Sequence, residues 1–229
     1  MCARANMGQV LGEGQRAGKW AHMTGHFRLG SGIAGAHISS RGFMQIERFD
    51  ISGPVLVTPH RFGDVRGWFS ETWSRETLRA VGLDWPDFVQ DNHSYSAPKH
   101  TLRGLHYQRP PRAQDKLVRV SRGVILDVAV DARAASPTYG QHVAVELSAE
   151  SGAQLYVPKG FLHGFLTLTE DCEVQYKCTD IYAPDCDGGV RWDSAGINWG
   201  VDTPVLSERD ARAIPFAEFE APFRYEESP

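Results

Sequence analysis

Two histidines and a lysine stand in segments whose other residues are typical of β-strands. His106 and Lys116 lie ten residues apart in Thr101–Val120, TLRGLHYQRPPRAQDKLVRV, and His163 follows in VPKGFLHGF. Imidazole and amine groups in such a setting are compatible with a proton-transfer site, a metal site, or ordinary residues of the core and surface. The residues around them discriminate among these three alternatives.

Alternation along the predicted strands indicates which side chains share a face. Each ionisable side chain taken singly is compatible with packing or solvation, and only their convergence in one place favours a function. Because Tyr176, His163 and Lys116 all lie on apolar faces of predicted strands, the sequence predicts one polar pocket inside a β-barrel. The faces are Cys172, Val174, Tyr176 and Cys178; Phe161, His163, Phe165 and Thr167; and Lys116, Val118 and Val120.

A metal site is the less favoured alternative. Pro158-x-Gly160-x-x-His163 resembles the second short motif of cupins, in which that histidine is a ligand. The first cupin motif needs HxH and then a carboxylate, but the matching stretch here is His106-Tyr107-Gln108, and no carboxylate stands at the expected distance before Lys116. Zinc and iron need about three good protein ligands, and a cationic lysine opposes a divalent ion. The sequence therefore predicts no metal.

Bulk composition is ordinary for a soluble globular protein. The chain has 229 residues, 41% hydrophobic and 23% charged, with a formal net charge of −4. The charge gives no reason to expect binding to nucleic acid or to an anionic membrane. No apolar run approaches the ~18 residues that span a membrane. The four cysteines have no metal-finger spacing or disulfide framework, which predicts reduced thiols and a cytoplasmic protein.

Short predicted strands separated by turns dominate the chain after Met44. They favour a sandwich or barrel over βαβ units. A helix capped by Ser74 is expected at 74–81, a short one at 207–213, and a loop at 60–67. The predicted strands and extended segments are 46–49, 55–59, 68–73, 88–96, 116–121, 124–131, 142–147, 154–157, 161–169 and 173–179.

The first part of the chain has a different composition. Residues 1–43 are rich in Gly, Ala, Arg and His and show no sustained periodicity. This predicts a disordered N-terminal extension, compatible with a start codon assigned too far upstream and Met44 as the natural start. Residues 44–229 are then one domain with a C-terminal tail.

Seven segments resemble the dTDP-4-dehydrorhamnose 3,5-epimerase family in order and spacing. The resemblance runs from Met44 to about Pro215. It implies an all-β, cupin-type jelly-roll β-barrel with a few short helices at the periphery. It also implies a homodimer with exchanged N-terminal strands and no metal or organic cofactor. The segments are FGDVRGWFSETW (62–73), FVQDNHSYS (88–96), LRGLHYQ (102–108), AQDKLVRV (113–120), VPKGFLHGF (157–165), YKCTDIYAP (176–184) and GVRWDSAGINW (189–199).

The reaction that this resemblance implies is inversion at C3 and C5 of dTDP-4-dehydro-6-deoxy-D-glucose, giving dTDP-4-dehydro-L-rhamnose. Both carbons are α to the C4 ketone, so the site needs a base, a group that stabilises the enolate oxygen, and an acid on the opposite face. By resemblance His106 is the base, Asp210 orients it, and Lys116 faces the oxyanion. Tyr176 returns the proton from the other face, which favours double inversion over the alternative of a mono-epimerase.

The resemblance also implies residues that bind the substrate. Arg103 and His163 would hold the sugar, and Arg209 would reach the diphosphate. Arg66, Glu71, Gln90 and Asn92 match substrate-binding positions, while Tyr182 and Phe62 would stack on the thymine.

One feature of this sequence conflicts with an ideal strand. Arg103 and His106 are an odd number of residues apart, so a regular strand would place them on opposite faces. Gly104 between them is compatible with a bulge that turns both side chains inward.

Overall fold

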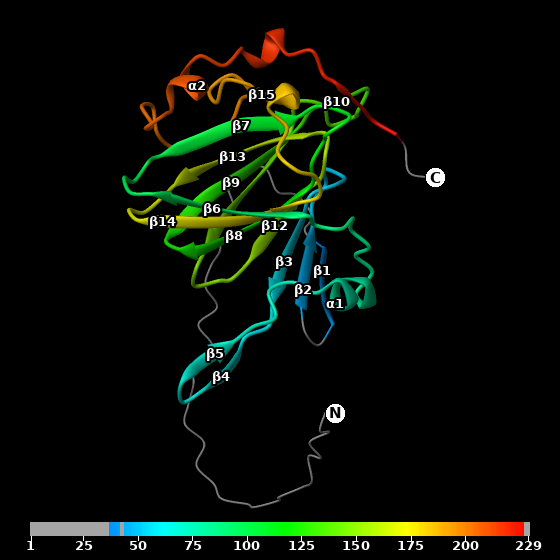
Figure 1. The fold of residues 1–229 in the computed structure, drawn as a ribbon, viewed down its shortest axis with the longest axis vertical. Coiled ribbons are helices and arrows are strands. Elements are labelled where there is room, and N and C mark those ends of the chain that lie inside the picture. Colours follow the sequence, from blue (N-terminus) through cyan, green and yellow to red (C-terminus); the bar gives the residue numbers. More distant parts are fainter. Residues whose placement is uncertain (1–36, 42–43, 227–229) are drawn as a thin grey trace, which may run out of the picture.

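A seven-stranded and a five-stranded antiparallel sheet form the body of the computed structural model, which describes residues 37–41 and 44–226 (Figure 1). The arrangement confirms the predicted all-β jelly-roll barrel. The seven-stranded sheet has the order β1 (His37–Arg41), β2 (Met44–Arg48), β3 (Val55–Pro59), β12 (Gln154–Val157), β8 (Lys116–Arg122), β14 (Cys172–Cys178), β6 (Gln90–Ser96). The five-stranded sheet has the order β11 (His142–Ser148), β9 (Val124–Asp131), β13 (Phe161–Thr167), β7 (Leu102–Gln108), β15 (Asp187–Gly189).

Short elements lie at the periphery of these sheets. Helix α1 (Arg75–Ala80) begins after Ser74, whose hydroxyl accepts the Thr77 N–H at 3.3 Å, as the sequence predicts. The second predicted helix is α2 (Glu208–Ala211), with Ser207 as its N-cap. Other peripheral elements are β10 (Arg133–Ala134) paired with β16 (Phe223–Arg224), and the 3-10 turns η1 (Pro184–Cys186) and η2 (Phe216–Glu218).

Two predictions about the N-terminal part need correction. A loop was expected at residues 60–67, but β4 (Phe62–Asp64) and β5 (Gly67–Phe69) pair as a hairpin whose turn is closed by Gly67 at φ +134°. Within the segment 1–43, expected to be disordered, residues 37–41 form β1 because β2 offers them a free edge for backbone pairing. The rest of that segment lies outside the described residues, so the predicted extension and its boundary remain a prediction.

The main core lies between the two sheets and confirms the predicted faces. Val118, Val120, Cys172 and Val174 of the larger sheet pack with Phe161, Phe165, Ile125 and Ala129 of the smaller one, and Tyr176 packs against this cluster. The alternate residues point outward, since Leu162 and Leu166 belong to a different cluster. His163 and Lys116 therefore share the inward faces of their strands, as alternation requires.

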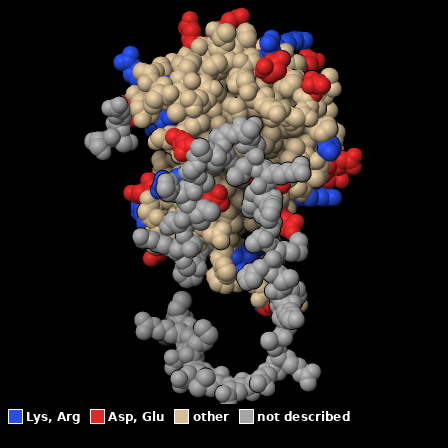
Figure 2. Space-filling model, turned by 180° about the vertical axis from the view of Figure 1, so that it is seen from behind, with Lys and Arg blue, Asp and Glu red and all other residues tan. Residues whose placement is uncertain are grey.

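The C-terminal segment covers the outer face of the five-stranded sheet (Figure 1). Val190, Trp199, Phe219 and Phe223 are buried there against residues of β7, β9 and β13. This packing brings α2 beside β7 and so places its side chains at one end of the barrel. Charged side chains of both signs are interspersed around the face in Figure 2. No helix among the described residues is long and apolar enough to cross a membrane.

Candidate active site

A cavity of about 380 Å³ opens between the two sheets, beside the segment that leads into α2. It is lined from β7, β8, β13 and β14 and from the C-terminal segment, so its walls come from parts of the chain more than a hundred residues apart. Seven of the residues predicted for the site line it: Arg103, His106, Lys116, His163, Tyr176, Arg209 and Asp210.

A bulge at Gly104 brings Arg103 and His106 to the same cavity. His163 pairs with His106 and Phe165 with Arg103, so β7 has one residue more than β13 between these pairs. Gly104 adopts φ +133°, and a Cβ there would lie 2.5 Å from the Gly164 Cα. Only glycine fits this close backbone contact. The predicted bulge is confirmed, and it resolves the odd spacing.

His106 forms a hydrogen-bonded pair with Asp210. Their Nε2 and Oδ1 atoms are 2.6 Å apart, and the second carboxylate oxygen accepts the Gly104 N–H at 3.5 Å. The Ser207 N-cap hydroxyl accepts the Asp210 N–H at 3.1 Å and so fixes the first turn of α2. Burial by itself would raise the pKa of Asp210, but the hydrogen bond and charge of His106 outweigh it and lower that pKa. The carboxylate therefore stays ionised beside the imidazole.

His163 has a carboxylate partner of its own, which the sequence prediction missed. Its Nε2 lies 2.8 Å from Asp127 Oδ1, and both residues are buried. Burial lowers the pKa of His163, and the charge of Asp127 offsets this only in part. The other carboxylate oxygen of Asp127 is buried without a hydrogen-bond partner. Asp127 shares the alternation of β9 with Ala129 and Asp131, a signal that could have placed it on the inner face.

Lys116 and Tyr176 complete the inner wall of the cavity. Lys116 is opposite Cys178 on β14, and burial lowers its pKa while the charges of Cys178, Asp127 and Asp187 act in the opposite direction. Burial likewise raises the pKa of Tyr176, which keeps its phenol protonated at neutral pH. The cavity thus combines a histidine–carboxylate pair, an amine and a neutral phenol.

Asp187 connects Arg209 and Tyr182 at the rim of the cavity, and the sequence prediction did not include it. Its Oδ2 lies 2.7 Å from Arg209 Nη1 and accepts the Tyr182 hydroxyl at 3.1 Å. Arg209 lines the same cavity as His106. In the sequence Asp187 is one of several acidic residues near the tail, close to Asp185 in PDCDGG. No periodicity distinguishes it from the others.

Six predicted substrate-binding residues do not line the cavity: Tyr182, which lies at its rim, and Phe62, Arg66, Glu71, Gln90 and Asn92. Phe62 and Arg66 belong to the β4–β5 hairpin, which projects away from the sheets (Figure 1). The Arg66 side chain pairs with Asp64 within the hairpin. Glu71 follows the hairpin and accepts the Thr77 hydroxyl at 2.5 Å. The remaining two, Gln90 and Asn92, are hydrogen-bonded to each other at 2.9 Å on β6, and Gln90 also accepts the Tyr182 N–H at 2.8 Å.

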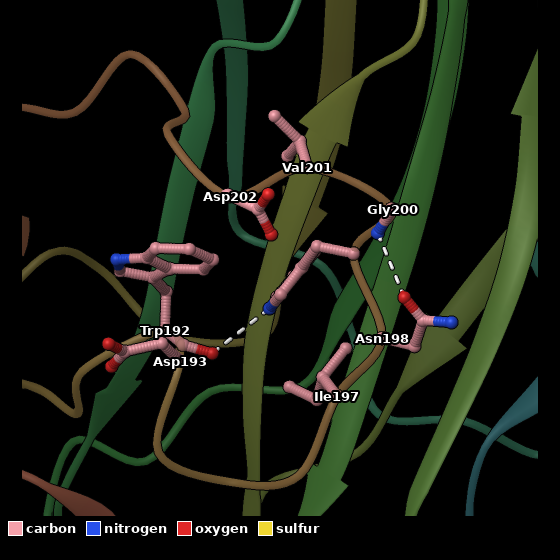
Figure 3. Close-up of a pocket in the computed structure, with 8 residues that line it drawn as sticks. Trp192, Asp193, Ile197, Asn198, Gly200, Val201 and Asp202 are labelled. Atoms are coloured by element: carbon pink, nitrogen blue, oxygen red, sulfur yellow. Dashed lines mark hydrogen bonds between the residues drawn. The ribbon is translucent and has the colours of Figure 1, made fainter.

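A second hollow, of about 370 Å³, lies along the C-terminal segment (Figure 3). Its lining comes from residues 192–202 alone, with Trp199 Nε1 bonded to the Trp192 carbonyl and Gly200 N–H to Asn198. Its acidic side chains, Asp193 and Asp202, have no histidine or lysine beside them in that lining. In the described ranges no three His, Cys, Asp or Glu side chains are grouped so that they could hold a metal ion. Of these two hollows, only the cavity between the sheets has histidine and lysine side chains beside a carboxylate in its lining.

Comparison with protein families identifies one family. The family model described as dTDP-4-dehydrorhamnose 3,5-epimerase matches residues 48–218. A curated dTDP-4-dehydrorhamnose 3,5-epimerase from Sinorhizobium fredii is 48% identical over 189 residues, which cover 80% of this chain and 94% of that protein.

Solved structures have the same fold. A dTDP-4-dehydrorhamnose 3,5-epimerase from Bacillus anthracis, solved with TDP and PPi bound, is 43% identical with a TM-score of 0.73, covering 76% of this chain and 99% of that one. A dTDP-6-deoxy-D-glucose-3,5-epimerase from Legionella pneumophila, solved in complex with dTDP-4-keto-L-rhamnose, is 40% identical with a TM-score of 0.75, covering 80% and 99%.

Proposed function

The chain belongs to the dTDP-4-dehydrorhamnose 3,5-epimerase family, and from this membership we propose that it converts dTDP-4-dehydro-6-deoxy-D-glucose to dTDP-4-dehydro-L-rhamnose. The reaction inverts C3 and C5 by removing and returning protons α to the C4 ketone. It serves the biosynthesis of dTDP-L-rhamnose. The observation that supports it most is the His106–Asp210 pair at 2.6 Å in one cavity with Lys116 and Tyr176.

His106 is the base in this proposal. Its imidazole takes the proton from the carbon α to the ketone, and Asp210 stabilises the imidazolium that forms. Because Asp210 is almost fully buried, solvent screens its charge little. The two acceptor oxygens of the carboxylate, held by His106 and by the Gly104 N–H, keep the imidazole in one orientation.

Lys116 stabilises the enolate oxygen that develops at C4. Burial lowers the pKa of the Lys116 amine more than the charges around it raise that pKa, so a developing oxyanion beside the amine is a strong partner for its positive charge. His163 and Arg103 hold the sugar on either side. Arg103 is anchored on β6, where it donates to the Ser96 hydroxyl at 3.1 Å and to the Tyr95 carbonyl at 3.0 Å.

Tyr176 delivers the proton from the opposite face. It lies on β14, in the seven-stranded sheet, whereas His106 lies on β7 in the five-stranded sheet, so the two groups approach a sugar in the cavity from different walls. A raised phenol pKa leaves the proton in place until a strongly basic enolate appears. An acid and a base on opposite walls support inversion rather than simple exchange.

The nucleotide end is built in part by a second copy of the chain. Tyr182 stacks on the thymine and Arg209 reaches the diphosphate at the rim, with Gln90 and Asn92 beside them on β6. Phe62, Arg66 and Glu71 lie on or next to the projecting hairpin, so in a homodimer they would enter the partner's site. The hairpin presents large exposed apolar side chains, Phe62, Val65, Trp68 and Phe69, which such an interface would cover.

No metal or organic cofactor takes part in this proposal, and the protein is cytoplasmic. Enolate chemistry of this kind needs an electrophile at the ketone oxygen, a place that Lys116 fills. Cys172, Cys178 and Cys186 are free thiols, as expected in a reducing compartment.

Proton NMR of the dTDP-4-keto sugar in deuterated water, with the full-length protein, tests the function. Deuterium should enter at both C3 and C5, at the same rate with and without a chelator. Incorporation at one carbon alone would make the protein a mono-epimerase. Loss of activity with the chelator, restored by a divalent ion, would instead indicate a metal-dependent cupin. Gel filtration with light scattering tests the homodimer.

A further inference from the structure

Asp115 is a buried carboxylate directly before Lys116 and outside the cavity lining. Its side chain is only 3% exposed, and Oδ1 accepts the Lys159 N–H at 2.6 Å. The phenol of Tyr156 lies beside it, and after burial the Asp115 charge is the main cause that raises the pKa of Tyr156. Both groups that donate to this carboxylate, the Lys159 backbone N–H and the Tyr156 hydroxyl, are uncharged. The burial of Asp115 is therefore not explained by pairing with a cation in these contacts.

The backbone of Asp115 is tied to a third part of the barrel. Its N–H donates to the Thr179 hydroxyl at 2.8 Å, and its carbonyl accepts the Thr179 N–H at 3.1 Å. The preceding Gln114 donates to the Asp180 carbonyl at 2.7 Å. The chain that enters β8 is thereby held against the chain that leaves β14.

Three strand ends meet at Asp115, and each carries a residue of the proposed site. Lys116 follows it in β8, His163 lies four residues after Lys159 in β13, and Tyr176 lies three residues before Thr179 in β14. The turn 158–160, which Asp115 binds, closes a small cavity behind Lys116, His106 and His163. Asp115 therefore adds side-chain and backbone hydrogen bonds between the ends of three strands whose side chains must converge on one sugar.

We propose that Asp115 is a positioning residue for the epimerisation: it sets the placement of Lys116 relative to His163 and Tyr176 without touching the substrate. This rests on the proposed function. Loss of the carboxylate lets the turn 158–160 move away from β8. The ammonium of Lys116 then meets the oxyanion at a less favourable distance, a loss realised in the transition state rather than in nucleotide binding.

Steady-state kinetics and deuterium incorporation with full-length variants test this. In Asp115→Ala we expect kcat to fall about 10- to 100-fold with KM changed less than about 3-fold. In Asp115→Asn the amide oxygen still accepts the Lys159 N–H, so kcat should return to within about 5-fold of the wild type. The affinity for dTDP, measured by calorimetry, should stay unchanged in both.

Asp131→Ala is the matched control. Asp131 is equally buried and accepts hydrogen bonds from Arg133, Ser136 and Thr138, but it ends β9 and is bonded to neither β8 nor β14. Its replacement should lower thermal stability and leave kcat within about 2-fold. An equal loss of kcat in this control would overturn the proposal, because the effect of Asp115→Ala would then follow from lost stability alone.

Thr179→Val keeps the test decisive if Asp115→Ala fails to fold. It removes the acceptor of the Asp115 N–H and should lower kcat about 3-fold or more with unchanged KM. Wild-type kcat in Thr179→Val and in any folded Asp115→Ala protein refutes the positioning role. A wild-type protein that incorporates no deuterium refutes the proposed function instead, so the two failures are distinct.

Discussion

Replacing Asp210 by asparagine removes the negative charge of the His106–Asp210 pair and leaves the size of the side chain almost unchanged. The carboxylate accepts from His106 at 2.6 Å and from the Gly104 N–H at 3.5 Å. An amide has one acceptor oxygen, so asparagine can serve only one of these donors. If its oxygen stays with Gly104, its NH₂ faces His106 Nε2 and selects the tautomer that has its proton on the other nitrogen.

The loss follows from the kind of hydrogen bond that is broken. A hydrogen bond to a charged group contributes about 1.5–3 kcal/mol. Because Asp210 is 5% exposed, little of this is screened by solvent. Since the imidazolium exists only after proton abstraction, the loss falls on the transition state. We expect kcat to drop roughly 10- to 150-fold with KM nearly constant.

The assay is deuterium incorporation at C3 and C5, followed by NMR, beside steady-state kinetics. Glu208→Gln is the control, because Glu208 lies in the same helix, is exposed and, among the described residues, forms an ion pair only with Arg212, at 3.4 Å. It should behave as the wild type. An Asp210→Asn enzyme with kcat within about 3-fold of the wild type would refute the assignment of His106 as a base that depends on this carboxylate.

Three further predictions concern the phenol, the bulge and acid stability. Tyr176→Phe should still exchange deuterium through His106 but lose inversion at one carbon or both, seen as single incorporation or as recovered starting sugar. Gly104→Ala should lower the free energy of unfolding by at least about 3 kcal/mol in urea titrations, because the added Cβ would clash with the Gly164 backbone. Gly196→Ala is the control: Gly196 has φ +69° but no atom near its Cβ position, so the substitution should cost only about 1–2 kcal/mol. The pKa of Asp210 is lowered in the fold, so its contribution to stability is present above its unfolded pKa of ~3.9 and is lost as the pH falls through the folded value. Asp210→Asn should therefore show a flatter loss of stability between about pH 5 and 2 than the wild type, and parallel curves would contradict this.

Much of the barrel could be predicted because strand alternation is a local property. The inward faces of β8, β13 and β14 follow from period two, and they place Lys116, His163 and Tyr176 correctly. Ser74 and Ser207 mark both helix starts, since an N-cap is recognised from a few neighbouring residues. The hairpin β4–β5 was missed because HRFGDVRG lacks the apolar alternation that a buried strand shows.

The sequence by itself determined which chemical groups are present, the all-β class, and, through seven motifs in order, the family. Only the tertiary structure decided how these groups meet. Asp127 pairs with His163, Asp187 pairs with Arg209, and Asp115 contacts the ends of three strands. The residues next to these aspartates in the chain do not indicate which partner each one has. Contacts between distant segments depend on strand register, and register depends on all the strands packing together at once. Gly104 is an example of both. The glycine in the sequence is compatible with a bulge, and the close contact with the backbone of β13 in the structure shows that the bulge forms there.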